Sequence, residues 1–509
     1  MKSIVVFYDQ ESEYSDEKVF NGKTVEEISE EWASSLTAAS IHIKNCADVS
    51  ELLNKICIAA DENQADYVIF SYSDLPFLNK ALTEKIIKLH LDFKAEYTFA
   101  DGYPYGFSPE VIDKGTLHIL NELAKTNPEG KKPVTRESIF NVIKTDINSF
   151  DVESVLADED WRLLRYSFDC SKKENYIACK CLLNKISKKE HLYDYDVNEL
   201  SEIASKEEGI LKTVPGFYNI QITDKTTSNC KYSPYNEAYE KKYGINPFFA
   251  DKCMKLEDFK KLVKLISDFS GKAVVNLSAW GECFANPHIL DFVEEIMKYE
   301  GLSVFIETDG SLITEEICEK LKTIYENAAS RTNGYEKIMI AVCLDSFTAE
   351  TYNKIRGVSS GFDKAVSSIK LLGTALPGCV YPQFVRMLEN ENELESFYRF
   401  WNEKTNPSGG NLIIQKYDYY SGLLPDCKSA DLSPVDRNVC WHLRRDMTIL
   451  TDGSVPLCKE FVLNNIMGNV FAESLEEIWE KFNSTLREHI SCNYSEKCRK
   501  CDEFYTYNF

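Results

Sequence analysis

The sequence predicts an α/β protein with more than one domain. Its 509 residues exceed what one hydrophobic core usually holds, and a typical domain size of about 150 residues suggests about three domains. Short apolar stretches of strand character alternate with segments whose apolar residues recur at helical spacing. Four cysteines near the C-terminus have the spacing of metal ligands. These observations predict domains over residues 1–185, 211–428 and 429–509, with a linker at 186–210.

The first region begins with a predicted apolar strand at residues 4–8. A second buried strand, at 67–71, runs into the polar segment Tyr72-Ser73-Asp74-Leu75-Pro76. Helical and strand patterns alternate through the rest of the region, which places it in the α/β class. The charged stretch at 186–210 is compatible either with a linker or with a solvated helix.

From about residue 211, strand-then-helix units repeat along the chain. Between the first two strands, Phe259, Leu262, Val263 and Ile266 fall on one face of a predicted helix. Repeated strand–helix units imply a parallel sheet, either open or closed into a partial barrel. The six strands are predicted at residues 217–223, 273–277, 302–307, 338–344, 382–388 and 412–415.

Distinctive residues follow three of these strands. Trp280-Gly281-Glu282 comes after the second strand, Glu307-Thr308-Asp309-Gly310 ends the third, and Cys343-Leu344-Asp345-Ser346 ends the fourth. The carboxyl ends of parallel strands meet at one edge of a sheet, so functional residues are expected there. Each motif by itself is also compatible with ordinary turn chemistry.

The C-terminal cysteines are Cys440, Cys458, Cys498 and Cys501. Two residues separate the last pair, a gap that lets two thiolates reach one metal centre. Thr451-Asp452-Gly453 predicts a tight turn between the first pair, which is therefore expected on the arms of a hairpin. The set indicates one iron–sulfur cluster. A structural zinc ion uses the same ligand types, and buried cysteines also occur without metal.

Composition limits the expected partners and compartment. A formal net charge of −23 disfavours nucleic acid and anionic membrane surfaces as partners. No stretch approaches the roughly 18 apolar residues of a membrane span, and no leader is visible at the N-terminus. Seventeen cysteines in a long chain without an export signal favour a reducing compartment. We therefore expect a cytoplasmic protein without nucleic-acid or membrane partners.

The order of the strand-end motifs, followed by Tyr352-Asn353-Lys354-Ile355-Arg356-Gly357, resembles the partial (β/α)6 barrel of the radical S-adenosylmethionine (radical SAM) superfamily. The segment from Cys440 onward resembles the SPASM or twitch extension of that superfamily, and the combination is similar to the group called spiro-SPASM proteins. The resemblance implies one [4Fe–4S] cluster on the four C-terminal cysteines. It also implies that Gly281 and Glu282 meet the amino group of S-adenosylmethionine, with Asp309 or Ser346 near its ribose.

The loop after the first barrel strand departs from the family pattern. Radical SAM enzymes use a CxxxCxxC motif, whose three cysteines leave one iron free to chelate the cofactor. Alignment on Pro234-Tyr235 makes the ligand positions Asn229, Ser233 and Asn236, while Cys230 lies one residue out of register. Neutral amide and hydroxyl oxygens are poor ligands for such iron. The cleaving cluster is therefore expected to be absent, which leaves binding of S-adenosylmethionine open.

The first region resembles sugar nucleotidyltransferases of the cytidylyltransferase-like group. The segments that carry this likeness begin at Asp74, Pro104 and Arg165. The resemblance implies that Asp74 and Asp169 hold a divalent cation against nucleotide phosphates. The phosphate-binding loop differs, because residues 9–16 are acidic and contain no glycine. We therefore expect this region to bind a partner or a sugar rather than to transfer nucleotides.

Two functions remain open at this point. The first is an auxiliary iron–sulfur protein that binds a peptide, a sugar nucleotide or a protein partner, or passes electrons. The second is an enzyme. It would be either a radical SAM enzyme that modifies a peptide or small molecule through unusual ligation at residues 229–236, or a nucleotidyltransferase acting through its first region. No catalytic residue is assigned from the sequence.

Overall fold

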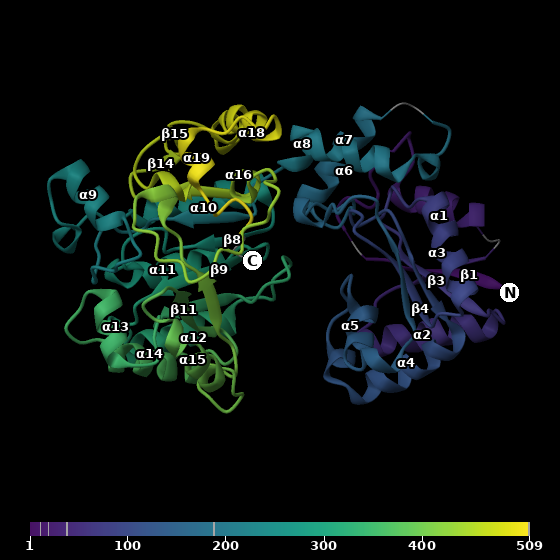
Figure 1. The fold of residues 1–509 in the computed structure, drawn as a ribbon, viewed down its shortest axis with the longest axis horizontal. Helices are drawn as coiled ribbons and strands as arrows, with labels where there is room; N and C mark the ends of the chain where they lie inside the picture. Colours follow the sequence, from purple (N-terminus) through teal and green to yellow (C-terminus); the bar gives the residue numbers. More distant parts are fainter. Residues whose placement is uncertain (11, 19, 37–38, 187–188, 507–509) are drawn as a thin grey trace. The chain divides into compact units, whose positions relative to one another are not determined.

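The computed structural model describes residues 1–10, 12–18, 20–36, 39–186 and 189–506. The chain divides into two compact units, residues 1–213 (unit 1) and 214–509 (unit 2), which are described separately (Figure 1). Each unit has its own parallel or mixed sheet and its own apolar core. The predicted α/β class is confirmed.

Unit 1 is built on a mixed sheet in the order β2-β1-β3-β5-β4-β6. The neighbours β2, β1 and β3 are parallel, while β5 runs antiparallel to both β3 and β4. Residues 4–7 of β1 are buried without alternation, as expected for a strand covered on both faces. The strands are β1 (Ser3–Tyr8), β2 (Ser40–Ile43), β3 (Tyr67–Tyr72), β4 (Tyr97–Asp101), β5 (Glu110–Asp113) and β6 (Val152–Leu156).

The helices of unit 1 include the segment expected to be a linker. In residues 186–210, Val197, Leu200 and Ala204 lie on one face of α7 and are buried in the core of unit 1. The charged residues of this amphipathic helix occupy its other face, which explains the polar composition. The helices are α1 (Val25–Leu36), α2 (Val49–Glu62), α3 (Lys80–Phe93), α4 (Lys114–Thr126), α5 (Ser138–Lys144), α6 (Lys173–Lys185), α7 (Val197–Lys206) and α8 (Glu208–Leu211).

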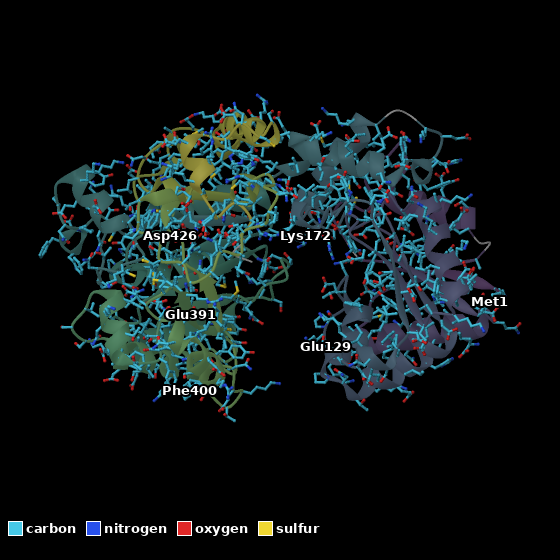
Figure 2. All side chains as sticks on the ribbon, viewed as in Figure 1. Met1, Glu129, Lys172, Glu391, Phe400 and Asp426 are labelled. Atoms are coloured by element: carbon cyan, nitrogen blue, oxygen red, sulfur yellow. The ribbon has the colours of Figure 1, made fainter. Side chains whose placement is uncertain are left out.

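Unit 2 contains a curled parallel sheet in the order β12-β11-β10-β9-β8-β7-β13. Strands β7 to β12 follow one another in chain order, as the strand–helix repeat predicts. Glu391, labelled in Figure 2, pairs with Arg386 at the end of β11. These strands are β7 (Phe217–Ile220), β8 (Ala273–Asn276), β9 (Leu302–Thr308), β10 (Ile338–Cys343), β11 (Val380–Arg386), β12 (Ile413–Lys416) and β13 (Asp446–Ile449).

The C-terminal segment is joined to this sheet through β13, which pairs in parallel with β7. The hairpin expected between Cys440 and Cys458 is therefore only partly formed. A tight turn at Gly453 is present, but β14 (Ser454–Pro456) pairs with β15 (Ile466–Asn469), not with β13. This pairing explains why residues 429–509, expected as a separate domain, lie in one compact unit with the barrel.

The helices of unit 2 alternate with its strands and then form the C-terminal cap. In Figure 1 the yellow C-terminal segment, with β14, β15, α18 and α19, gathers at one end of this unit beside α10. The helices are α9 (Tyr235–Tyr243), α10 (Leu256–Ser270), α11 (Ile289–Met297), α12 (Glu315–Asn327), α13 (Ala349–Arg356), α14 (Phe362–Ala375), α15 (Leu394–Trp401), α16 (Trp441–Arg445), α17 (Leu475–Lys481), α18 (Asn483–Ile490) and α19 (Glu496–Lys500).

The inner face of the barrel has an apolar layer followed by a polar one. Phe217, Val274, Phe305 and Ala341 pack together inside the sheet, apart from the core beneath the helices. Side chains on one face of a strand recur every second residue, so the next inward position lies two residues further along. Those positions are polar on every strand of the barrel: Asn219, Asn276, Glu307, Cys343, Gln383 and Gln415.

None of the helices in the described part of the chain combines the length and apolar character needed to cross a lipid bilayer.

Candidate cluster site and barrel cavity

The polar layer forms the floor of a cavity of about 380 Å³ at the carboxyl ends of the barrel strands. Two amide pairs line it: Asn276 donates to Asn219 (3.0 Å), and Gln383 donates to Gln415 (2.8 Å). Burial raises the pKa of Glu307, the carboxyl group of this layer. Buried polar groups require hydrogen-bond partners, so the cavity suits a polar ligand.

The degenerate cluster loop lies at the mouth of this cavity. The Asn236 side-chain amide donates to the carbonyl of Ser228 and to Oδ1 of Asn229, both at 3.1 Å. The hydroxyl of Ser233 accepts from the backbone N–H of Tyr235 at 3.4 Å. Cys230 also lines the cavity, and burial raises its pKa to about 11. One thiol among amides and a hydroxyl is a donor set that does not fit a [4Fe–4S] cluster.

A buried ion pair that was not predicted from the sequence holds this loop. Asp345 is fully buried and accepts from Tyr232 (2.8 Å), from the backbone N–H of Val385 (2.9 Å) and from Arg356 (3.4 Å). Arg356 also lies 3.8 Å from the sulfur of Cys230. In the sequence, the only indication of this ion pair was that Leu344-Asp345 is followed by Arg356-Gly357. Arg356 therefore anchors both the loop and its single thiol.

The residues expected to contact S-adenosylmethionine are only partly brought together. Gly281, Glu282 and Asp309 line the cavity, but Ser346 does not, and its hydroxyl donates to the carbonyl of Leu344 at 3.2 Å. A Cβ at Gly281 would lie 2.4 Å from the carbonyl oxygen of Thr223, so glycine is required there.

The carboxyl group of Glu282 is engaged inside the protein. It accepts from the Thr308 hydroxyl (2.7 Å) and from the backbone N–H of Asp309 (3.0 Å). Burial, together with the charge of Asp309, raises the pKa of Glu282 to about 7. Glu282 thus fixes the end of β9, and both of its carboxyl oxygens are already hydrogen-bonded within the protein.

The four C-terminal cysteines line a second, smaller cavity in unit 2. Cys440 precedes α16, Cys458 follows β14, and Cys498 and Cys501 lie in and at the end of α19. The backbone N–H of Trp441 donates to the carbonyl of Phe504 at 2.8 Å, which fastens the chain end beside Cys440. Cys492 is exposed and lies outside the residues that line this cavity.

The surroundings of these thiols fit a metal centre. Burial raises the pKa of Cys440 to about 12 and also raises the pKa of Cys458 and Cys501, whose thiols lie near one another. Thiols in such a position ionise only when a cation compensates their charge, as a coordinated metal does. The backbone N–H of Glu503 donates to the sulfur of Cys501 at 3.3 Å, an interaction that stabilises a thiolate. The chemistry of the donor set therefore fits an iron–sulfur cluster.

Buried ion pairs connect the two cavities. Lys459, which follows Cys458, lines both cavities and lies 3.3 Å from Asp418 and from Glu503. Lys416 pairs with Glu503 and with Asp502, the latter at 3.2 Å. Asp418, Asp502 and Glu503 lie close enough to share a cation, but these lysines already supply positive charge. This network was not predicted from the sequence, in which charged residues directly beside two of the cysteines were the only signal.

In unit 1 the two aspartates expected to bind a cation are brought together. Asp74 follows β3, and the backbone N–H of Cys170, next to Asp169, donates to the Asp74 carbonyl at 3.0 Å. Both residues are buried, at 2% and 3% exposure. Phe107 and Phe168 stack at 5.1 Å, which holds the two segments of the expected transferase motif side by side.

An acidic cluster closes the end of β1, where the sequence lacks a phosphate-binding loop. Nδ1 of His42 lies 2.7 Å from Asp9, Nε2 contacts Glu30, and Glu26 lies 3.9 Å away. The hydrogen bond to Asp9, followed by that to Glu30, raises the pKa of His42 from 6.5 to about 9. Three carboxylates thus surround His42, and Lys44 lies 3.2 Å from Asp9, so this edge of the sheet carries more acidic than basic groups.

This shift predicts a pH-dependent contribution of His42 to stability. A raised pKa in the folded state stabilises the fold fully below about pH 6.5, and the stabilisation is lost as the pH rises towards about 9. We expect wild type to exceed His42→Asn in free energy of unfolding by up to about 3 kcal/mol at pH 6 and to lose this advantage above about pH 9. Urea denaturation across this range measures the difference. His118→Asn on α4 is the control, and a pH-independent difference for His42→Asn contradicts the prediction.

The chain is similar to several known proteins. Residues 440–502 match the SPASM family model, described as an iron–sulfur cluster-binding domain. An uncharacterized protein of Treponema pallidum is 37% identical over 377 residues, which cover 73% of this chain and 98% of that protein. The subtilosin biosynthesis protein AlbA of Bacillus subtilis is 30% identical over 122 residues, 23% of this chain and 24% of AlbA. The structure of Streptococcus suis SuiB bound to precursor peptide SuiA covers 63% of this chain and 79% of that one, with 14% identity and a TM-score of 0.41.

The curled parallel sheet, its polar cavity and the cysteine-lined site beside it define an iron–sulfur protein of the radical SAM type. This chain is a radical SAM/SPASM protein, with its SPASM domain at residues 440–502. Members of this family usually bind iron–sulfur clusters.

Proposed function

We propose that this protein holds one [4Fe–4S] cluster on Cys440, Cys458, Cys498 and Cys501 and has an auxiliary, non-cleaving role. The observation that carries the proposal is the contrast between the two cavities. Four thiols line one small cavity, whereas the barrel cavity is lined by two, Cys230 in the degenerate cluster loop and Cys343 in the polar layer. A [4Fe–4S] cluster takes four thiolates, or three when the cofactor chelates the fourth iron, so the described residues offer iron one suitable site.

The barrel loop favours ligand binding over reductive cleavage. Its amides are paired with each other, and Cys230 lies beside the guanidinium of Arg356. Without a cluster at this position, S-adenosylmethionine loses the iron that would hold its methionyl end. Gly281, Glu282 and Asp309 still line a polar cavity, which supports binding of a small polar molecule or of a peptide side chain. AlbA acts in the biosynthesis of a bacteriocin, which makes a peptide the first partner to test.

A bound C-terminal cluster would supply one-electron transfer. Lys459 contributes to both cavities, so a molecule in the barrel and the thiol site share one buried ammonium group and its carboxylate partners. None of the 17 cysteines, all of which lie in the described part of the chain, forms a disulfide, which is compatible with the reducing, cytoplasmic environment that we propose.

Anaerobic reconstitution with iron and sulfide, followed by metal analysis, tests the proposal. We expect about four iron atoms per chain and no 5′-deoxyadenosine when S-adenosylmethionine and a strong reductant are added. About eight iron atoms per chain, or stoichiometric 5′-deoxyadenosine, would contradict the absence of a cleaving cluster. About one zinc ion per chain in place of iron would contradict the cluster assignment itself.

A further inference from the structure

The aspartate pair of unit 1 carries an inference independent of the proposed function, which concerns unit 2. Two buried carboxylates held close together repel each other and require a positive charge between them. In an enzyme that transfers nucleotides, a divalent cation supplies that charge and also binds the phosphates. Unit 1 therefore needs a positive charge beside Asp74 and Asp169.

The group that faces them is the guanidinium of Arg136. Its Nη1 donates to Oδ1 of Asp74 at 2.8 Å, and its Nη2 donates to Oδ2 of the same carboxylate. Nη2 also lies 3.7 Å from Oδ1 of Asp169. A planar guanidinium matches a carboxylate in this two-point geometry, which a metal ion does not displace without breaking both hydrogen bonds.

Aromatic rings hold Arg136 in this position. Its guanidinium carbon lies 4.3 Å from the ring centre of Tyr72 and 5.8 Å from that of Tyr105. Only 19% of the Arg136 side chain is exposed, so the cation is desolvated and fixed rather than free to swing out.

Asp169 has the remaining donors that an ionised carboxylate needs. It accepts from the hydroxyls of Ser167 (2.6 Å) and Ser171 and from the amide of Asn175 (2.8 Å). Burial alone would raise the pKa of Asp169, but Arg136 and these hydrogen bonds lower it below its ordinary value. The aspartates, the guanidinium and the hydroxyls thus satisfy one another without a metal.

We propose that Arg136 takes the place of a divalent cation between Asp74 and Asp169, so that unit 1 holds no catalytic metal. The acidic cluster of Asp9, Glu30 and His42 at the end of β1 supports the same conclusion, because it offers no positive charge in excess for a triphosphate. Unit 1 is then a binding module, and its cation site is latent: removal of the guanidinium leaves two buried carboxylates free to take up a metal ion.

Manganese binding by the full-length protein tests this proposal. We compare wild type with Arg136→Met, which keeps the length of the side chain but removes the charge, and with Arg136→Met/Asp74→Asn. Free Mn²⁺ is measured by electron paramagnetic resonance. We expect Arg136→Met to take up about one Mn²⁺ per chain more than wild type, and the double variant to lose this extra ion. We also expect Mn²⁺ to raise the Tm of Arg136→Met more than that of wild type.

Two outcomes would overturn the proposal. One is an Arg136→Met protein that folds but binds no additional Mn²⁺. The other is a wild-type protein that binds one Mn²⁺ which the Asp74→Asn variant does not bind. That result would place a metal between the aspartates in the native protein. It can be measured even if the Arg136→Met protein fails to fold.

Discussion

Cys498→Ala abolishes cluster binding: we expect the reconstituted variant to fall from about four iron atoms per chain to less than about one. Cys498 lies in α19 and reaches the same small cavity as Cys440 and Cys458. An alanine methyl group cannot coordinate iron, so one iron of the cluster would lose its thiolate ligand. Iron analysis and the electron paramagnetic resonance signal of the reduced protein measure the loss.

Two matched controls separate ligand loss from general damage. Cys492→Ala removes an exposed thiol six positions before Cys498, and Cys230→Ala removes the only thiol of the barrel loop. Both variants should keep their iron and their signal. Because cluster binding and folding are coupled, Cys498→Ala should also unfold at a lower temperature than either control. Retention of the full signal by Cys498→Ala, or its loss in Cys230→Ala, would exclude the proposed ligand set.

Arg356→Met is expected to lower the free energy of unfolding by about 3–5 kcal/mol. The substitution leaves Asp345 fully buried without its charged partner, while Tyr232 and the N–H of Val385 remain as neutral donors. The neighbouring Gly357 packs so closely on the loop that a Cβ there would lie 2.4 Å from the carbonyl oxygen of Asn229. Loss of Arg356 therefore also loosens the mouth of the cavity. Urea denaturation followed by circular dichroism measures the change.

Lys354→Met is the control for this prediction. Lys354 lies on the same helix, is 61% exposed, and is 3.9 Å from Glu389. Exposed pairs of this kind contribute about 1 kcal/mol or less, so the two variants should differ by at least about 2 kcal/mol. Asp345→Leu in the Arg356→Met background should recover part of the loss, since no unpaired charge then remains buried. Equal stability of Arg356→Met and Lys354→Met would show that the ion pair does not hold the loop.

The order of the barrel strands could be predicted from the sequence because it rests on local patterns. A buried strand followed by a helix with one apolar face specifies a parallel neighbour, and this holds from β7 to β12. The same reasoning failed where pairing is non-local. β13 adds to the sheet beside β7, more than 220 residues earlier in the chain, and no periodicity marks that partner.

The residues of the candidate sites could also be predicted only in part. The residues of the cysteine set could be named because thiols at metal-ligand spacing are rare and chemically distinct. Lys459 and Arg136 could not be named, because lysine and arginine in a sequence are usually solvated surface residues. Their role depends on carboxylates from distant segments, such as Asp418 beside Lys459 and Asp74 beside Arg136.

By itself, the sequence determined the α/β class, the family resemblance of the second half, and the chemical contrast between four C-terminal cysteines and a barrel loop with one. Each of these rests on residue type and spacing along the chain. Only the tertiary structure decided that an arginine lies between the unit 1 aspartates and that a lysine lines both cavities of unit 2. The physical reason is that burial and charge pairing arise between segments that only folding brings together.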